Sequence, residues 1–386
     1  MTDKAYLLSM AVCAVSVLSA AIVPNAVVEK AGAERITVSV ATPPGAYTTI
    51  LKRNLQISGC FTLAKEGSIS VTGTPGASVS ASGRGKVITS TTAFADDRGA
   101  RMAARQFVDA MVKTYSDGGK GFATTRIAFI NRKGADNAEL YTCYPDGYDI
   151  RSLTSDGCAA VGPRWAPNGT DIYYTSFLHK FGNVFRINAE NGQRSQLAPF
   201  KGTATGAAVA PDGSRCAIIL SYQGNPELYI FNFSTKMVRR MTMTPNAAEA
   251  SPCWSPDGSK IAYVSDQSRH PQVYILDVAT RKSVRFTNKG SENTNPDWSL
   301  DGMLVWASKR QGQTVLVVAD PSAGEASARV VTDPGSWEHP SWTANGRHVV
   351  ASRDKALFLV DTDPDADKPT QLFHNQGNWM NPACSR

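Results

Sequence analysis

The amino-acid sequence predicts a mainly β fold, a six-bladed β-propeller preceded by a small α/β domain. Three observations lead to this prediction. A tight-turn motif recurs at an even spacing, short apolar strands flank each copy, and the first part of the chain lacks the repeat. Repeats of about 44 residues with several short strands each are typical of propellers, in which one repeat forms one blade.

The turn motif is clearest at Trp254–Gly258, whose sequence is Trp-Ser-Pro-Asp-Gly. Proline presets φ at the first turn position, aspartate bonds to its own backbone, and glycine accepts a positive φ. The apolar residues on both sides therefore indicate two antiparallel strands joined by a hairpin. The turn glycines of the five copies follow one another at intervals of 44, 45, 44 and 44 residues, at Gly169, Gly213, Gly258, Gly302 and Gly346.

The prediction of six blades comes from the two ends of the repeat region. Arg126–Ile130 matches the strand Lys260–Val264, but no turn motif precedes it. Near the C-terminus, Asn381–Ser385 resembles Asn295–Ser299, so we expect it to supply the missing inner strand of the first blade. Five full units and one split unit give six blades. The tryptophan that precedes four of the five turns is expected to pack between neighbouring blades.

Residues 1–33 have the pattern of a cleaved export signal. Lys4 precedes an apolar stretch from Ala5 to Val23, and Ala31–Ala33 has the small-x-small form of a cleavage site. The alternative is a retained membrane anchor, because a stretch of this length just reaches across a bilayer. Its many Ala and Ser residues favour removal, which predicts a soluble mature protein outside the cytoplasm.

Residues 34–122 do not follow the repeat and are expected to form the small α/β domain, with the propeller occupying residues 123–386. The expected elements are a strand at 36–40, a helix at 46–57, a short strand at 61–63, a hairpin or ragged sheet edge at 68–92, and a helix from Asp96 to about Tyr115.

Charge and cysteine content narrow the functional classes. The formal net charge is +7 over 386 residues, but no run of Lys and Arg exceeds two residues, so we do not expect nucleic-acid binding. The six cysteines beyond the export signal are irregularly spaced and indicate no zinc site. Cys143 and Cys158 are the closest pair for a possible disulfide, whereas Cys216 and Cys253 fall at buried strand positions.

No motif argues for catalysis, a cofactor or a metal. The sequence contains no Gly-x-Ser-x-Gly elbow and no Gly-rich phosphate loop, and its histidines lie outside any His-Glu-x-x-His spacing. Asp361–Asp367 alternates like a calcium loop, but Leu372 stands where the bidentate glutamate belongs, which favours an acidic hairpin turn. We therefore predict a protein that is not an enzyme.

The expected function is partner binding at the mouth of the propeller channel. Loops that enter the innermost strands should converge there, and polar residues that do not repeat suit a binding surface better than the repeated scaffold does. The expected binding residues stand just before the Pro-x-Trp positions, namely Thr205, Glu249, Ser251, Thr294, Asn295, Glu338, His339 and Asn381.

The sequence resembles the TolB family of periplasmic propeller proteins in the Tol–Pal envelope system. The resemblance rests on the repeated Trp-Ser-Pro-Asp-Gly hairpins, on Ser265–Gln267 leading to Pro271–Tyr274, on Tyr144–Tyr148, and on Leu55–Phe61 in the first domain. Two departures from the family stand out. The tract between Leu63 and Ser68 leaves no room for a helix and strand usual there, and Thr203 stands where a histidine is expected.

The resemblance implies a monomeric periplasmic scaffold that binds a peptidoglycan-associated lipoprotein at the propeller face. It also implies contact with an inner-membrane Tol protein through the N-terminal part, and roles in outer-membrane integrity, cell division and macromolecule import. The protein would then meet membranes only through its partners. Two alternatives remain, a carbohydrate- or peptide-binding propeller unrelated to Tol–Pal and the non-catalytic propeller of a peptidase-like protein.

Overall fold

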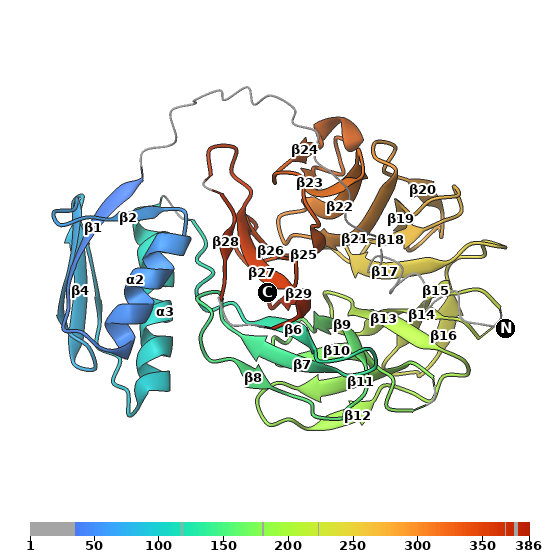
Figure 1. Ribbon diagram of the computed structural model, residues 1–386, viewed down its shortest axis with the longest axis horizontal. Helices are drawn as coiled ribbons and strands as arrows, with labels where there is room; N and C mark the ends of the chain where they lie inside the picture. The colour runs from blue at the N-terminus through green and yellow to red at the C-terminus, as the bar shows by residue number, and fades with distance from the viewer. Residues whose placement is uncertain (1–34, 117–118, 180, 223, 367, 374–376) are drawn as a thin grey trace.

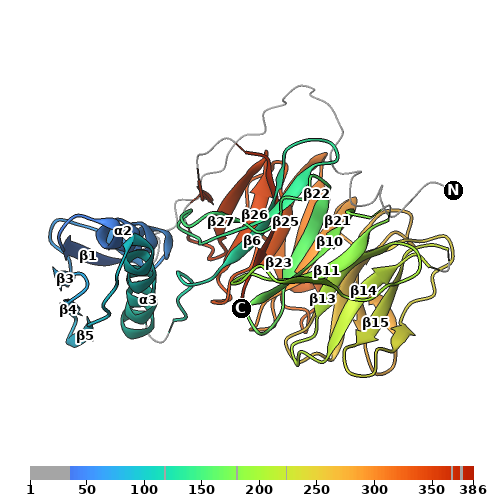
Figure 2. The ribbon, with the colours of Figure 1, turned by 90° about the horizontal axis from the view of Figure 1, so that it is seen from below.

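A computed structural model describes residues 35–116, 119–179, 181–222, 224–366, 368–373 and 377–386 (Figure 1). It contains six four-stranded sheets and one five-stranded sheet accompanied by two helices. The six sheets surround a common centre, and the part with the helices lies beside this disc (Figures 1 and 2). The predicted fold class is confirmed. The predicted export signal, residues 1–33, lies outside the described residues.

The N-terminal sheet has the strand order β2-β1-β3-β4-β5, with β1 parallel to β2 and β3 and the remaining pairs antiparallel. Helices α2 and α3 cover the face of this sheet that is turned toward the propeller (Figures 1 and 2). The elements are β1 (Ile36–Ala41), α2 (Ala46–Ile57), β2 (Phe61–Leu63), β3 (Ile69–Thr74), β4 (Ser78–Gly83), β5 (Lys86–Ser90) and α3 (Asp97–Tyr115).

The sequence-based expectations for this region hold with one refinement. Residues 68–92, expected as a hairpin or ragged edge, form the three strands β3, β4 and β5. The chain passes from β2 to β3 without another helix or strand, as the short tract after Leu63 predicted. Asp96 starts α3 because its carboxylate accepts a hydrogen bond from the Gly99 N–H at 2.7 Å.

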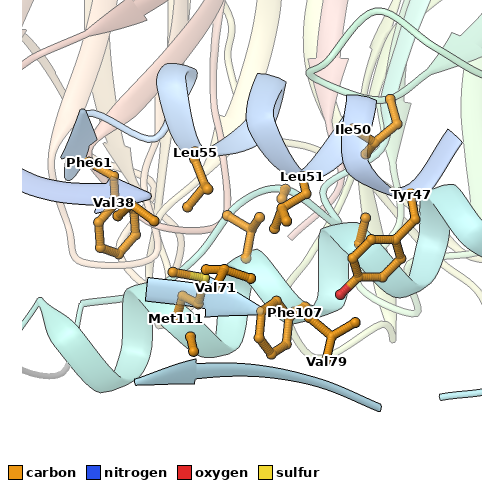
Figure 3. Packing of buried hydrophobic residues seen from close by; sticks show 14 of the residues in the cluster. Val38, Tyr47, Ile50, Leu51, Leu55, Phe61, Val71, Val79, Phe107 and Met111 are labelled. Carbon is orange, nitrogen blue, oxygen red and sulfur yellow. The ribbon is translucent and has the colours of Figure 1, made fainter. Parts of the chain in front are cut away.

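One face of each helix builds the core of this part (Figure 3). Leu51 and Leu55 of α2 and Met111 of α3 are fully buried and meet Val38 and Val71 of the sheet. Leu51 and Leu55 are four residues apart and therefore lie on the same side of α2, as an amphipathic helix requires. The open face of the sheet is polar, so this core depends on the helices for its cover.

Each blade has four strands that follow one another in the chain, except that the innermost strand of blade 1 comes from the C-terminus. Blade 1 contains β29 (Trp379–Cys384), β6 (Ile127–Arg132), β7 (Ala138–Cys143) and β8 (Arg151–Ser152). Blade 2 contains β9 (Ala160–Trp165), β10 (Asp171–Ser176), β11 (Asn183–Asn188) and β12 (Arg194–Gln196). Blade 3 contains β13 (Ala204–Val209), β14 (Arg215–Leu220), β15 (Glu227–Asn232) and β16 (Val238–Arg240).

The remaining three blades follow the same plan. Blade 4 contains β17 (Glu249–Trp254), β18 (Lys260–Ser265), β19 (Gln272–Asp277) and β20 (Ser283–Arg285). Blade 5 contains β21 (Glu292–Trp298), β22 (Leu304–Arg310), β23 (Gln313–Ala319) and β24 (Arg329–Val330), with a 3-10 turn at Glu325–Ser327. Blade 6 contains β25 (Glu338–Trp342), β26 (His348–Arg353), β27 (Ala356–Asp361) and β28 (Thr370–Gln371).

The C-terminal strand completes the first blade. β29 pairs antiparallel with β6, placing Cys384 opposite Ile127 and Met380 opposite Ile130. Trp379 of β29 contacts Phe129 edge-on, with ring centroids 5.3 Å apart. This pairing confirms the inner strand predicted from Asn381–Ser385, and it covers the inner edge of β6.

The recurrent tryptophans pack between blades, as predicted. The Trp165 indole N–H donates to the Ala383 carbonyl of blade 1 at 3.0 Å, and the Trp254 indole donates to the Ala208 carbonyl of blade 3 at 2.9 Å. Trp298 differs, because its indole donates to the Gly302 carbonyl of its own turn at 2.9 Å. These three rings thus pack between sheets while their indole N–H groups find carbonyls, whereas the buried Trp342 indole nitrogen has no partner among the described atoms.

The N-terminal part is attached to blade 1 by a buried charge cluster. Arg105 of α3 lies 2.7 Å from Asp146 and 2.8 Å from Asp149, both in the turn between β7 and β8. Its guanidinium also stacks over the Tyr144 ring at 3.8 Å, and Asn54 of α2 donates to Asp146 at 2.9 Å. Both sides of the Arg105–Asp146 pair are excluded from water.

A second attachment uses the acidic segment after β27. Arg347 forms an ion pair with Asp361 at 2.7 Å and reaches the Gly59 carbonyl at 3.4 Å. The Asp361 carboxylate is therefore engaged by an arginine, in agreement with the acidic hairpin turn that the sequence favoured. Asp367, at the end of the same segment, lies outside the described residues.

The six cysteines beyond residue 34 are free thiols. The pairing of Cys143 with Cys158 that the spacing left open is not formed, whereas Cys216 and Cys253 are buried in the core, as predicted. In the described part of the chain, the helices are all too short or too polar to span a membrane.

Candidate functional site

A ring of β-bulges surrounds the propeller axis. The register of the innermost strand slips once against its neighbour in every blade. At each slip one residue has a positive φ, and in five of the six blades proline follows it. Because proline has no N–H to donate, the ladder cannot continue unbroken there, and the bulge accommodates the gap. The positive-φ residues are Gly162, Gly206, Ser251, Asn295, His339 and Asn381.

The structure corrects the predicted position of the site residues. All eight were expected in loops that enter the innermost strands, but they lie within the strands themselves. A bulge allows strand pairing to resume beyond a proline and a positive φ. Their positions are Thr205 in β13, Glu249 and Ser251 in β17, Thr294 and Asn295 in β21, Glu338 and His339 in β25, and Asn381 in β29.

These eight side chains nevertheless share one place, because all of them line a cavity of about 670 Å³ at the centre of the disc. Thr203, the position at which the resemblance implies a histidine, lines the same cavity. Gly162 and Gly206 complete the ring, and the sequence reasoning missed them because it looked for polar residues. Gly162 stands three residues before Trp165, as Ser251 stands three residues before Trp254. This shared spacing was the signal that could have identified Gly162 from the sequence.

The cavity has two unlike walls. Blades 4 to 6 contribute mostly polar residues, among them six of the eight predicted residues, Glu249, Ser251, Thr294, Asn295, Glu338 and His339. Blades 1 and 2 contribute a mostly apolar wall. This wall includes Ala138, Ala159, Ala160, Val161, Phe177 and Phe181. A bound segment would therefore find hydrogen-bonding groups on one side and apolar surface on the other.

A salt bridge across the axis forms the inner end of the cavity. Arg164 of blade 2 reaches Asp297 of the opposite blade 5 at 3.0 Å, and Arg164 itself lines the cavity. Asp297 also accepts the Trp342 N–H at 2.8 Å and pairs with Arg386. The Asp297 side chain is 3 % exposed, whereas the Arg164 and Arg386 side chains are 22 % and 26 % exposed, so a buried carboxylate with two partly exposed arginines ties four blades together.

Burial changes the charge state of three cavity residues. It raises the pKa of Glu249 to about 8, and together with the charge of Asp354 it raises the pKa of Glu338 to about 7. Burial and the nearby Arg164 lower the pKa of His339 to about 4. At neutral pH His339 is thus uncharged and Glu249 is mostly protonated. The cavity therefore carries less negative charge than its carboxyl count suggests.

The lining offers hydrogen bonding and apolar contact in place of a cluster of reactive groups. Among the residues that the structure describes, no set of three or more His, Cys, Asp or Glu side chains is arranged to hold a metal ion. The second strongly shifted histidine, His348, lies away from the cavity and stacks on Phe122 with ring centroids 4.4 Å apart. Burial lowers its pKa to about 4, in keeping with a packing role.

Comparison with known proteins bears on the identity of this site. The TolB protein of the Tol-Pal system from Anaeromyxobacter dehalogenans is 32% identical over 159 residues, which make up 41% of this chain and 36% of that protein. The Tol-Pal TolB of Anaeromyxobacter sp. matches with the same values. The matched region thus spans just over a third of these relatives' length.

A solved structure shares the fold over a much longer stretch. The crystal structure of TolB from Acinetobacter baumannii superposes with a TM-score of 0.80 at 22% identity, covering 92% of this chain and 98% of that one. The family described as the TolB beta propeller domain matches residues 116–386, which include all six blades and the ring of bulges. The chain belongs to the TolB β-propeller family.

Proposed function

We propose that this protein is a periplasmic scaffold without enzymatic activity that binds a peptidoglycan-associated lipoprotein in the central cavity. The observation that carries the proposal is the convergence of all eight predicted residues on one cavity of about 670 Å³ in a propeller of the TolB family. A cavity of this size with one polar and one apolar wall suits a protruding peptide segment of a partner.

The wider cellular role follows from the same proposal. The Tol-Pal names of the relatives and the export pattern of residues 1–33 support a place in the envelope, where the protein would help maintain outer-membrane integrity. An inner-membrane Tol protein would be contacted through the N-terminal part. The buried cluster around Arg105 supports this arrangement, because it holds α3 against the turn between β7 and β8 of blade 1.

A pulldown from envelope extract tests the proposal with three baits. The double variant Thr294→Ala/His339→Asn should capture at least tenfold less lipoprotein than the wild type, since two wall contacts worth about 1 kcal/mol each are lost. Asparagine is chosen at 339 because Asn295 and Asn381 occupy the equivalent bulge position with nearly the same φ. The backbone should therefore remain undisturbed.

The control bait is Ser195→Ala, which changes an exposed residue on the outermost strand of blade 2. It should capture as much lipoprotein as the wild type. Failure of the wild type to capture any lipoprotein would overturn the proposal, and equal capture by the double variant would place the binding surface elsewhere. Elution of the wild-type complex by a polysaccharide or an unrelated peptide would favour a carbohydrate- or peptide-binding propeller instead.

A further inference from the structure

The junction between blades 3 and 4 contains two buried carboxyl groups. Glu227 begins β15 and Glu249 begins β17, and the two residues are 1% and 2% exposed. The Thr244 hydroxyl connects them, because its Oγ1 lies 2.7 Å from Glu249 Oε1 and 3.3 Å from Glu227 Oε2. Two acids of neighbouring blades therefore share one small, dry site.

The hydrogen bonds around the two acids are unequal. Glu227 accepts from Arg240 at 2.8 Å, from Thr242 Oγ1 at 2.5 Å and from the Thr244 N–H at 2.8 Å. Glu249 accepts from Ser265 Oγ at 2.9 Å and from Thr244, both at Oε1. Its other oxygen, Oε2, is fully buried and has no partner among the described atoms.

One positive charge therefore faces two acids. Asp266 adds a further carboxylate beside the pair, since it accepts the Ala248 N–H at 2.7 Å. Among the described residues, the phenols of Tyr229 in β15 and Tyr263 in β18 also face the pair, and burial raises the pKa of both above the usual value. They stay neutral and cannot balance a second negative charge. Two carboxylates this close in a dry site cannot both ionise cheaply, so one of them holds a proton.

The expected holder of the proton is Glu249. Burial and the charge of Glu227 raise the pKa of Glu249 to about 8. The pKa of Glu227 is lowered even though burial acts to raise it, because Thr242, Thr244 and Arg240 hydrogen-bond its ionised form. The arrangement agrees with a neutral Glu249 carboxyl beside an ionised Glu227, the two acids being connected through the Thr244 hydroxyl.

The next junction contains the same arrangement built from amides. Gln272 begins β19 as Glu227 begins β15, and Asn293 precedes Trp298 by five residues as Glu249 precedes Trp254. The Asn293 amide donates to Gln272 Oε1 at 2.7 Å, and Thr287 donates to the same oxygen at 2.8 Å. Because the Asn293 amide N–H donates to the Gln272 amide oxygen, this pair connects blades 4 and 5 without a shared carboxyl proton.

We propose that Glu227 and Glu249 share one proton and form a pH-sensitive latch between blades 3 and 4. Loss of the proton leaves two negative charges in the junction and loosens the start of β17. Ala248–Pro252, at this start, forms part of the cavity wall. The latch therefore couples the shape of the cavity to pH. It does not depend on which partner the cavity binds.

The sign of the effect follows from proton linkage. A carboxyl whose pKa is higher in the folded than in the unfolded protein stabilises the fold fully below its ordinary pKa, 4.5 for glutamate. This contribution is lost as pH rises toward about 8. The latch is therefore closed in weak acid and neutral solution and opens under alkaline conditions.

Hydrogen exchange of the full chain, read by mass spectrometry at about pH 6 and about pH 9.5, tests the latch once intrinsic exchange rates are corrected. In the wild type, a peptide covering 247–254 should lose roughly tenfold or more of its protection at the higher pH. The peptide covering 291–298, which contains the amide junction, should change little and is the internal control. The variant Glu249→Gln should keep residues 247–254 protected at both pH values.

A second measurement keeps the proposal testable if the variant folds poorly. Because Glu338 also holds a proton near pH 7, the measurement is made on the variant Glu338→Gln. Its infrared spectrum near neutral pH should contain a protonated carboxyl band that disappears on alkaline titration. Absence of this band would overturn the proposal. So would a parallel change of both peptides in the wild type, or the same pH response in a folded Glu249→Gln variant.

Discussion

Replacing Arg105 with alanine should lower the free energy of unfolding by about 3–5 kcal/mol, the loss expected when one partner of a buried ion pair is removed. The Arg105 and Asp146 side chains are 1% and 0% exposed, so the variant leaves an unpaired carboxylate where no water reaches it. Urea unfolding followed by circular dichroism measures the loss. Because α3 would detach from blade 1, the N-terminal part should also become more sensitive to protease.

Arg101→Ala is the matched control. Arg101 lies on α3, as Arg105 does, and pairs with Asp149. Its side chain is 21% exposed, so water can solvate Asp149 when the arginine is removed. The expected loss is at most about 1 kcal/mol. Equal effects of the two variants would contradict the view that the Arg105 cluster is the main attachment between the two parts of the chain.

Asp297→Ala should produce a second loss of about 1–3 kcal/mol, because it leaves the buried Trp342 backbone N–H without its acceptor and removes the carboxylate that pairs with Arg164. Asp297 pairs with two arginines and the Trp342 N–H. Its removal should also widen the inner end of the cavity. Thermal unfolding measures the stability change, and hydrogen exchange of the inner strands shows whether the blades loosen.

Glu292→Ala is the control for this variant, since it breaks an ion pair at the outer end of the same cavity. Glu292 lies 2.9 Å from Lys309, and their side chains are 35% and 41% exposed. We expect a loss below about 1 kcal/mol. A comparable loss in both variants would show that the axial salt bridge has no special structural role.

The repeat itself could be predicted from the sequence because its signals are local. A Pro-Asp-Gly turn fixes its own geometry, as Asp257 shows by accepting the Ser259 N–H at 3.0 Å beside Gly258 with a φ of 68°. Turns at a regular interval then define the blades, and Asn381–Ser385 matched the inner strand that blade 1 lacked.

Long-range contacts could not be predicted in the same way. Arg105 meets Asp146 across 41 positions of the chain, and Arg164 meets Asp297 across 133. Nothing in the sequence near either residue indicates its partner. The bulges escaped prediction for a different reason, since proline and a positive φ usually end a strand. The sequence therefore predicted the residues of the candidate site, but it placed them in loops although they lie in the innermost strands.

The central claim, that the cavity binds a peptidoglycan-associated lipoprotein, is tested most directly by calorimetric titration with the purified soluble domain of that lipoprotein. We expect the soluble lipoprotein domain to bind saturably, and with equal affinity, to the wild type and to Ser195→Ala. It predicts binding at least about tenfold weaker to Thr294→Ala/His339→Asn. The absence of binding to the wild type, or equal affinity for the double variant, would contradict the claim.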